Sequence, residues 1–227
     1  MWKNIPAGNY VDGIFTETAT DIMRILITAG PTREKIDPVR FISNRSSGKM
    51  GYAIAECALS MGHEVILISG PVAIIPPAGA KIINVISAAD MASAVHQYAP
   101  ESDVVIMTAA VADYRPVHPF DSKMKKLPGK LVLELERTED ILAALGANKK
   151  AGQKLIGFAA ETDDLEQNAL GKLERKNLDW IAANDVADGF GTETNKVTLY
   201  GRNGEKILLP TAAKKEIAAQ ILREVLK

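Results

Sequence analysis

Short apolar runs alternate with amphipathic segments along most of this 227-residue chain, and this alternation constrains the fold more than any other feature. The apolar runs cover residues 23–30, 64–71, 103–114, 154–162 and 179–185. They are nearly continuous in apolar residues, which is typical of parallel strands buried on both faces. We therefore predict an α/β fold: a three-layer, Rossmann-like, mostly parallel sheet with helices on both faces.

The segments that separate and follow these runs have the spacing of amphipathic helices. Helices are predicted over residues 46–62, 87–99, 138–148, 163–177 and 212–227. Ser87 and Thr138 are candidate N-caps, because a hydroxyl can accept a hydrogen bond from the first turn. Residues 202–204 have turn chemistry and lie between two alternating runs, which predicts a late β-hairpin over residues 195–210.

The organisation of the chain is simple. Residues 1–21 show no clear period and are predicted to be an irregular leader or linker, whereas residues 22–227 are predicted to form a single domain. The 27 basic and 28 acidic side chains give a net charge of -1, which argues against bulk binding of nucleic acid. No apolar run reaches the roughly 20 residues that cross a membrane. With a single cysteine, Cys57, a cytoplasmic location is expected.

Ligands of such sheets bind beyond the carboxyl ends of the strands, so a binding site is expected at these strand ends. After the first run, a long loop leads to Ser46, Ser47 and Gly48 at a predicted helix start. Backbone N–H groups there can bind an anion, which is the favoured interpretation; the alternative is that the serines are ordinary N-caps. The first strand lacks a G-x-G-x-x-G motif, and the second ends in Ser69-Gly70-Pro71 without an acidic residue. An NAD site is therefore disfavoured.

The ends of the third and fourth runs carry further candidates. Ala109, Ala110 and Ala112 would let a flat ligand approach the backbone, or would simply permit tight packing. Asp113 could accept a hydrogen bond from an amino group or a ribose hydroxyl, or cap a turn. Phe158 could stack on a base, although a core position is the simpler interpretation.

Lysines gather in the segment DSKMKK, residues 121–126, with prolines on both sides that predict a flap rather than a helix. Lys123 and Lys125 share a face if this flap is extended. Ammonium groups held over a polyphosphate would stabilise its charge, but a lysine-rich loop is more often a solvated surface. Lys172 and Lys176, four residues apart, are predicted to lie on one helix face.

Taken in order, five stretches resemble the bacterial phosphopantothenoylcysteine synthetase family: ITAGPTREKIDPVRFISNRSSGKMG, AAVADYRP, the K-x-K-K of residues 123–126, GFAAET and RKNLDWIAANDV. The resemblance covers residues 24–227. It implies a ligase that activates the carboxylate of 4'-phosphopantothenate with CTP, giving an acyl-cytidylate and pyrophosphate. The amine of L-cysteine then forms the amide and releases CMP, a step of coenzyme A biosynthesis. The resemblance also implies Mg²⁺ with the triphosphate and a homodimer whose pantothenate site draws on both subunits.

The resemblance also implies roles for individual residues, but names no metal ligand. Lys123 resembles the lysine that forms the acyl-cytidylate, and Asn44 resembles the asparagine that turns it over. Substrate-binding positions are Arg40, Asn44 and Ala110. Nucleotide-binding positions are Met107, Thr108, Ala109, Asp113, Lys123, Glu139, Asp140, Ile141, Leu142, Phe158, Lys172 and Lys176. Glu139 stands where the family has proline.

Two other functions stay open beside the ligase. An NAD(P)-dependent oxidoreductase would shift its melting temperature with NADPH and not with CTP. A non-catalytic nucleotide-binding module would keep its function after Lys123→Gln. The base itself is also open, because related eukaryotic ligases prefer ATP to CTP. The strand-like segment 130–138 could supply a paired edge for a dimer.

Overall fold

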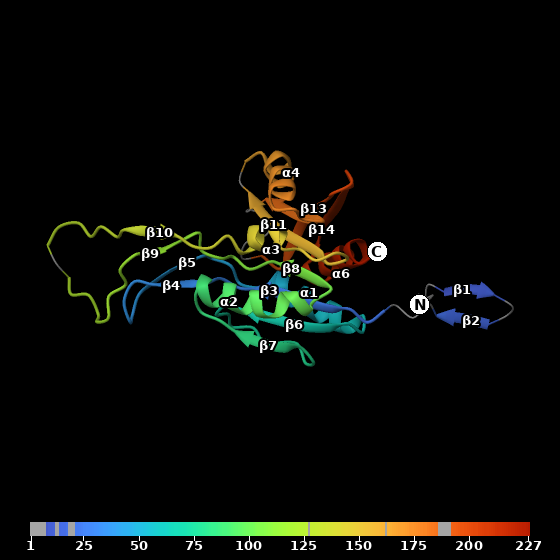
Figure 1. The fold of residues 1–227 in the computed structure, drawn as a ribbon, viewed down its shortest axis with the longest axis horizontal. Helices are drawn as coiled ribbons and strands as arrows, with labels where there is room; N and C mark the ends of the chain where they lie inside the picture. The colour runs from blue at the N-terminus through green and yellow to red at the C-terminus, as the bar shows by residue number, and fades with distance from the viewer. Residues whose placement is uncertain (1–7, 12–13, 18–20, 127, 162, 186–191) are drawn as a thin grey trace.

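The computed structural model describes residues 8–11, 14–17, 21–126, 128–161, 163–185 and 192–227. Its centre is an eight-stranded sheet with the order β14-β13-β12-β11-β8-β3-β6-β7 (Figure 1). Six neighbouring strands run parallel: β3 (Arg24–Ala29), β6 (Glu64–Ser69), β7 (Lys81–Asn84), β8 (Val104–Met107), β11 (Lys154–Glu161) and β12 (Trp180–Asp185). The predicted mostly parallel sheet is confirmed, and β7 is a strand that the sequence pattern did not reveal.

The late β-hairpin is also confirmed. Strands β13 (Thr194–Gly201) and β14 (Lys206–Ala213) pair antiparallel, and β13 adds antiparallel to β12 at the sheet edge. The turn between them contains Gly204 with a φ of 90°, a backbone conformation that glycine adopts without steric cost.

Helices cover both faces of the sheet, as predicted. On one face, α1 (Lys49–Ser60) and α6 (Lys214–Val225) bury their apolar sides. On the other face lie α2 (Ala88–Tyr98), which continues into the short 3-10 helix η1 (Ala99–Glu101), α3 (Ile141–Ala147) and α4 (Leu165–Arg175). Cys57 is buried on the apolar side of α1, and burial raises the pKa of its thiol, as expected of a structural cysteine.

One of the two predicted N-caps is wrong. Ser87 caps α2, since its hydroxyl accepts from the N–H of Asp90 while the Asp90 carboxylate accepts from the N–H of Ser87. Thr138, in contrast, donates its hydroxyl to the carbonyl of Ala112. Asp140 caps α3 instead, because its carboxylate accepts from the N–H of Ala143 at 3.0 Å.

The order of the parallel strands creates a crevice. From the central strand β3 the chain proceeds to β6 and β7 on one side, then returns to place β8, β11 and β12 on the other. Loops that leave β3 and β8 therefore diverge at their carboxyl ends, which is where doubly wound sheets bind ligands.

An extended arm projects from this end of the sheet (Figure 1). It consists of residues 33–43, 114–126 and 128–137, with two antiparallel pairs: β4 (Arg33–Lys35) with β5 (Phe41–Ser43), and β9 (Tyr114–Pro116) with β10 (Leu135–Arg137). The N–H of Phe120 donates to the carbonyl of Ile36 at 2.8 Å and joins the two halves. Between β9 and β10 the described residues form no helix or strand, which agrees with the predicted flap.

The N-terminal segment is more regular than expected. Strands β1 (Gly8–Val11) and β2 (Ile14–Glu17) pair antiparallel, apart from the main sheet (Figure 1). The expectation of an irregular leader is wrong here, because strand-forming residues flank the Asp12-Gly13 dipeptide, a hairpin signal. Residues 1–7, 12–13 and 18–20 lie outside the described residues. Among the helices described, none is long and apolar enough to cross a membrane.

Candidate active site

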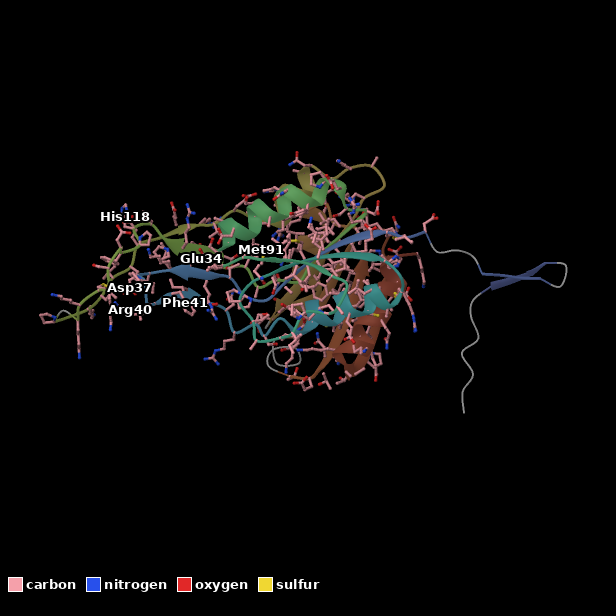
Figure 2. The ribbon with its side chains drawn as sticks, turned by 90° about the horizontal axis from the view of Figure 1, so that it is seen from below. Glu34, Asp37, Arg40, Phe41, Met91 and His118 are labelled. Carbon is pink, nitrogen blue, oxygen red and sulfur yellow. The ribbon has the colours of Figure 1, made fainter. Side chains whose placement is uncertain are left out.

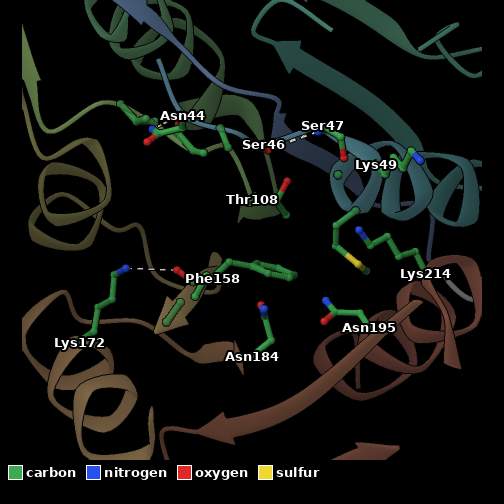
Figure 3. Close-up of a pocket in the computed structure, with 18 of the residues that line it drawn as sticks. Asn44, Ser46, Ser47, Lys49, Thr108, Phe158, Lys172, Asn184, Asn195 and Lys214 are labelled. Carbon is green, nitrogen blue, oxygen red and sulfur yellow. Dashed lines mark hydrogen bonds between the residues drawn. The ribbon is translucent and has the colours of Figure 1, made fainter. Parts of the chain in front are cut away.

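The crevice holds two neighbouring chambers at the carboxyl ends of the strands. The first has a volume of about 320 Å³ and lies between the start of α1, the loop after β8, and the ends of β11, β12 and β13 (Figure 3). The second, of about 430 Å³, lies between the loop after β8 and the starts of α3 and α4. Both are lined by Ala109, Val111, Asp113, Phe158 and Lys172, so they form one continuous cleft.

The start of α1 opens onto the first chamber. Its N-cap is Gly48, in the left-handed conformation with a φ of 78° and without a side-chain cap. The alternative that a serine caps this helix is therefore excluded; Ser46 instead accepts from the N–H of Gly48. Lys49, Met50 and Gly51 line the chamber, and N–H groups in a first turn have no partner within the helix. This turn can bind an anion, as predicted.

Asn44 is held beside Ala110 in the same chamber. Its Nδ2 donates to the carbonyl of Ala110 at 3.0 Å. The N–H of Ala110 in turn donates to the carbonyl of Gly30 at 2.9 Å, which binds the loop after β8 to the loop after β3. Two of the three predicted substrate-binding residues are thus neighbours.

The small residues after β8 have different roles. Ala109 and Ala110 line the cleft, as a ligand-binding edge requires. Ala112 is buried away from it, and its N–H donates to the hydroxyl of Thr32 at 3.0 Å. The packing interpretation therefore holds for Ala112, whereas the backbone at the other two alanines is open to a ligand.

Lys172 in α4 and Lys176 at the C-cap of that helix both reach the cleft, as predicted. Lys172 Nζ donates to the carbonyl of Phe158 at 3.2 Å, and Lys176 Nζ lies 2.8 Å from the carboxylate of Asp140. Burial tends to raise the pKa of Asp140, but the hydrogen bonds from Lys176 and the N–H of Ala143, with the nearby positive charges, lower it overall. Asp140 is therefore an anion at neutral pH, fixed between α3 and α4.

Phe158 separates the two chambers. It is half-buried and packs against the core on the α1 side, yet it lines both cavities. The core interpretation is thus correct for part of this side chain, and stacking on a base stays a prediction. Asp113 also lines both chambers and is exposed.

Most of the predicted site residues come together in this cleft. The second chamber is lined by Met107, Ala109, Asp113, Glu139, Asp140, Ile141, Leu142, Phe158, Lys172 and Lys176, and the first also by Thr108, Ala110 and Asn44. Glu139 bonds to the ring of His96 at 2.6 Å. The roles of all these residues stay predictions.

Arg40 and Lys123 are the exceptions, because both lie on the arm. They line a separate cavity of about 800 Å³, and Figure 2 shows Asp37 and Arg40 on the arm beyond the sheet. Arg40 binds the fully buried carboxylate of Asp37 through Nε at 2.9 Å and donates from Nη2 to the carbonyl of Met124 at 3.0 Å. The N–H of Met124 also donates to Asp37. The Asp37–Arg40 pair thus fixes the residue next to Lys123.

Replacement of Asp37 by Asn should release the lysine flap. The Arg40 guanidinium, assisted by the N–H groups of Val39, Arg40 and Met124 and opposed by burial, holds the pKa of Asp37 far below its usual range. A carboxylate whose pKa is lower in the folded than in the unfolded protein contributes stability at pH values above its unfolded pKa of about 3.9. The contact between Asp37 and Arg40 should therefore persist at neutral pH and weaken only below about pH 4. We expect faster tryptic cleavage at residues 123–126 in Asp37→Asn at pH 7.5.

The control for this experiment is Glu136→Gln, which removes an exposed ion pair with Arg115 on the same arm. Such pairs contribute at most about 1 kcal/mol, so cleavage should stay at the wild-type rate. Equal cleavage rates for Asp37→Asn and Glu136→Gln would contradict the anchoring role of Asp37.

Sequence reasoning missed four polar residues of the first chamber: Lys49, Asn184, Asn195 and Lys214. Asn184 could have been found, because it lies at the carboxyl end of β12 and strand ends were the search rule. Asn195 and Lys214 lie on the antiparallel hairpin and at the start of α6, where no such rule applies.

The end of β6 explains why no dinucleotide motif is present. A Cβ on Gly70 would lie 1.9 Å from the carbonyl oxygen of Pro31, so no acidic side chain fits at this position. The hydroxyl of the preceding Ser69 bonds to Tyr52 at 2.9 Å. A dinucleotide-binding fold has its ribose-binding carboxylate at the end of this strand. In this protein the backbone of Pro31 occupies that space.

Comparisons with known proteins agree with this geometry. Residues 21–227 match the family model described as the DNA/pantothenate metabolism flavoprotein C-terminal domain. The Coenzyme A biosynthesis bifunctional protein CoaBC of Bacillus subtilis is 55% identical over 205 residues, which make up 88% of this chain and 50% of that relative. The chain therefore spans about half the length of the curated CoaBC relatives that it matches.

Two solved structures extend the comparison. The crystal structure of the C-terminal domain of a Coenzyme A biosynthesis bifunctional protein CoaBC is 52% identical, with a TM-score of 0.79, covering 92% of this chain and 97% of that one. A Cab2 mutant in complex with phosphopantothenate-cysteine has a TM-score of 0.72 at 20% identity, covering 90% of this chain and 85% of that one. At that identity the second likeness concerns the fold.

Proposed function

Because this chain belongs to the DNA/pantothenate metabolism flavoprotein C-terminal domain family, we propose that it is a phosphopantothenate–cysteine ligase of coenzyme A biosynthesis. It activates the carboxylate of 4'-phosphopantothenate with CTP and releases pyrophosphate. The amine of L-cysteine then attacks the acyl-cytidylate, so that the amide forms, CMP leaves and the amine loses a proton. The proposed compartment is the cytoplasm.

The observation that carries this proposal is the two-chamber cleft at the end of the sheet, in a chain that is 52% identical to a C-terminal domain of CoaBC. A protein of the same fold was solved with phosphopantothenate-cysteine, which supports the proposed substrate class. The second chamber has a size and lining suited to a nucleoside, with Phe158 on one wall and Lys172 and Lys176 on another.

The chemistry of the cleft fits a polyanionic ligand in a nearly neutral protein. The first turn of α1 presents unpaired N–H groups, and Lys172 adds positive charge where the two chambers meet. Asn44, fixed on Ala110, would hold the acyl group for attack by the amine. Such fixed dipoles and charges stabilise charge that develops on phosphate without reorganisation during the reaction.

Mg²⁺ fits this arrangement as a companion of the triphosphate. Among the described residues no group of three or more His, Cys, Asp or Glu side chains could hold a metal. Mg²⁺ in nucleotide sites instead uses one or two carboxylates together with phosphate oxygens and water. Asp113, exposed in both chambers, would be its carboxylate ligand. The ion would neutralise charge on the phosphates.

A homodimer is part of the proposal, because Lys123 and Arg40 lie on the arm and not in the cleft. The arm also exposes apolar side chains that a partner would bury, including Phe41, Val132 and Leu135. Pairing of two arms would bring Lys123 of one subunit toward the cleft of the other. Strand β10 pairs with β9 within the same chain. Contact between two arms would therefore use side chains, and not the backbone edge that segment 130–138 was expected to offer to a partner.

Native mass spectrometry tests the dimer. We expect twice the 24.4 kDa of the chain for the wild type. Val132→Asp places a charge at a position that is 85% exposed in the single chain. This variant should give monomers whose melting temperature is the same as that of the main sheet and its helices in the wild type. A monomeric wild type at micromolar concentration would contradict the dimer and the shared site together.

The ligase itself is tested by product analysis. With 4'-phosphopantothenate, L-cysteine, Mg²⁺ and CTP, we expect equal amounts of amide and CMP, and less product with ATP. Amide formation with ATP alone would retain the chemistry and change the base. A melting temperature that rises with NADPH and not with CTP would instead favour the oxidoreductase.

A further inference from the structure

Two buried asparagines form one wall of the first chamber, and the roles described above do not involve them. Asn184 is 7% exposed and Asn195 is 4% exposed, and both line the cavity. Asn184 lies near the carboxyl end of β12. Asn195 lies on β13 at a β-bulge, a feature that often redirects a side chain beside an active site. Figure 3 shows both carboxamides directed into the chamber on the side of Phe158.

Hydrogen bonds fix the orientation of each carboxamide. Asn184 Nδ2 donates to the carbonyl of Asp185 at 2.7 Å, which leaves Asn184 Oδ1 as an acceptor. Asn195 Oδ1 accepts from the N–H of Lys196 at 3.0 Å, which leaves Asn195 Nδ2 as a donor.

The two remaining groups open onto the chamber. In the part of the chain that the structure describes, neither has a hydrogen-bond partner, and no fully enclosed side-chain nitrogen or oxygen is unpaired. Both atoms are therefore in contact with the solvent of the chamber. A ligand that supplies one donor and one acceptor could replace that solvent.

A cation completes this wall. Lys214 is 7% exposed and lines the chamber. It lies close to Asn195, because the residues that precede them in the sequence, Ala213 and Thr194, are paired across the hairpin. Figure 3 shows the Lys214 amine on the same side as the Asn195 carboxamide. Burial, together with the positive charge of Lys49, lowers the pKa of Lys214, so an anion bound beside it would restore the stability of its charged form.

The combination of groups discriminates between ligands. A polyphosphate offers only acceptors, and so does the carboxylate of phosphopantothenate; neither would use the Asn184 acceptor. An α-amino acid with an uncharged amine offers an acceptor carboxylate and a donor amine one carbon apart. We propose that Asn184, Asn195 and Lys214 form the subsite for L-cysteine, in which Lys214 and Asn195 bind the carboxylate and Asn184 accepts from the amine.

This subsite rests on the proposed function and suits its second step. Asn44 and Ala110, which would hold the acyl group, line the same cavity of about 320 Å³. An amine held by Asn184 is therefore enclosed in one chamber with the acyl carbon, and such proximity lowers the barrier to attack. Hydrogen bonding to Asn184 Oδ1 also orients the amine while its lone pair stays available for the new bond.

Steady-state kinetics with Asn195→Asp tests the subsite. The substitution keeps the shape but replaces the NH₂ donor by a carboxylate, which repels the carboxylate of cysteine. We expect the KM for cysteine to rise at least ~10-fold, on the scale of a lost charge-assisted hydrogen bond. The KM for CTP and the pyrophosphate released without cysteine should stay within about 3-fold, since these depend on other contacts. Asn203→Asp, on the exposed turn of the same hairpin, is the matched control and should leave all these values unchanged.

Cysteamine gives a second readout, because it lacks the carboxylate. The wild type should prefer cysteine, and Lys214→Met and Asn195→Asp should each lower the cysteine-to-cysteamine ratio of kcat/KM at least ~10-fold. A purely structural defect would lower both values together and leave the ratio unchanged. Partial misfolding of either variant would lower kcat/KM for both substrates by the same factor, so it would not change the ratio.

Two results would overturn the subsite. One is a rise in the KM for CTP with an unchanged KM for cysteine, which would assign this wall to the triphosphate. The other is an unchanged cysteine-to-cysteamine ratio in both variants. A wild type that releases no pyrophosphate would contradict the proposed function instead. In that case calorimetric titration with L-cysteine would still test the subsite. Binding to the wild type that is lost in Asn195→Asp would support it, and equal binding to both proteins would overturn it.

Discussion

Lys123→Gln is expected to abolish pyrophosphate release from CTP and 4'-phosphopantothenate while leaving the protein folded. The ammonium group of Lys123 would neutralise charge that develops around the α-phosphate, and removal of one such stabilising group costs about 10²–10³ in rate. Lys123 is exposed on the arm and makes no ion pair among the described residues. Its loss should therefore change the melting temperature by less than about 2 °C.

Lys130→Gln is the matched control for this variant. Lys130 is another exposed lysine of the arm and lines the same cavity as Lys123. Simple electrostatic attraction of polyanions would weaken equally in both variants, and this loss would diminish with salt. Comparable activity of Lys123→Gln and Lys130→Gln would show that the flap is a general basic surface. Selective loss in Lys123→Gln would support a specific role.

Gly51→Ala should destabilise the wall of the first chamber. A Cβ at this position would lie 2.5 Å from Thr108 Oγ1 and 2.6 Å from Ala29 Cβ, so α1 would have to move away from β3 and β8. Overpacking of this kind costs about 1–3 kcal/mol, and each kcal/mol lowers the melting temperature by about 2–4 °C in a domain of this size. Activity should fall further, because the first turn of α1, which lines the first chamber, would be displaced.

Gly171→Ala provides the comparison, since Gly171 is also a helix glycine. A Cβ there would approach only the flexible end of Arg175, at 2.9 Å. Alanine is favoured over glycine in a helix by about 1 kcal/mol, so we expect an unchanged or slightly higher melting temperature. Thermal melts with parallel activity assays check both variants. A Gly51→Ala protein as stable and active as Gly171→Ala would contradict close packing at α1.

The sequence was sufficient to predict the main sheet except for β7, because the other parallel strands are buried on both faces and have long apolar runs, whereas β7 has only four residues, none of them buried. The same reasoning failed for the arm. Strands β4, β5, β9 and β10 have only three residues each and carry charges such as Arg33 and Glu136. Their pairing depends on contacts between segments far apart in the sequence, such as Phe120 with Ile36. Local patterns contain no signal for contacts of that kind.

The candidate site was predictable where residues follow parallel strands. Asp113 and Phe158 were found by the strand-end rule, and the resemblance placed Asn44 and Lys176 correctly within the same cleft. The rule fails for Lys214, which reaches the cleft from the start of α6, and for Asn195 on an antiparallel strand. It also cannot show that Lys123 lies on an arm away from the cleft, because strand order and loop direction are tertiary properties.

Pyrophosphate release from 4'-phosphopantothenate and CTP, with Mg²⁺ and with or without L-cysteine, tests the central claim most directly. We predict release in both cases, with the acyl-cytidylate detectable by mass spectrometry when cysteine is absent, and amide and CMP only when cysteine is present. No release with CTP or ATP, from a folded protein that still binds CTP, would contradict the ligase and leave a nucleotide-binding module.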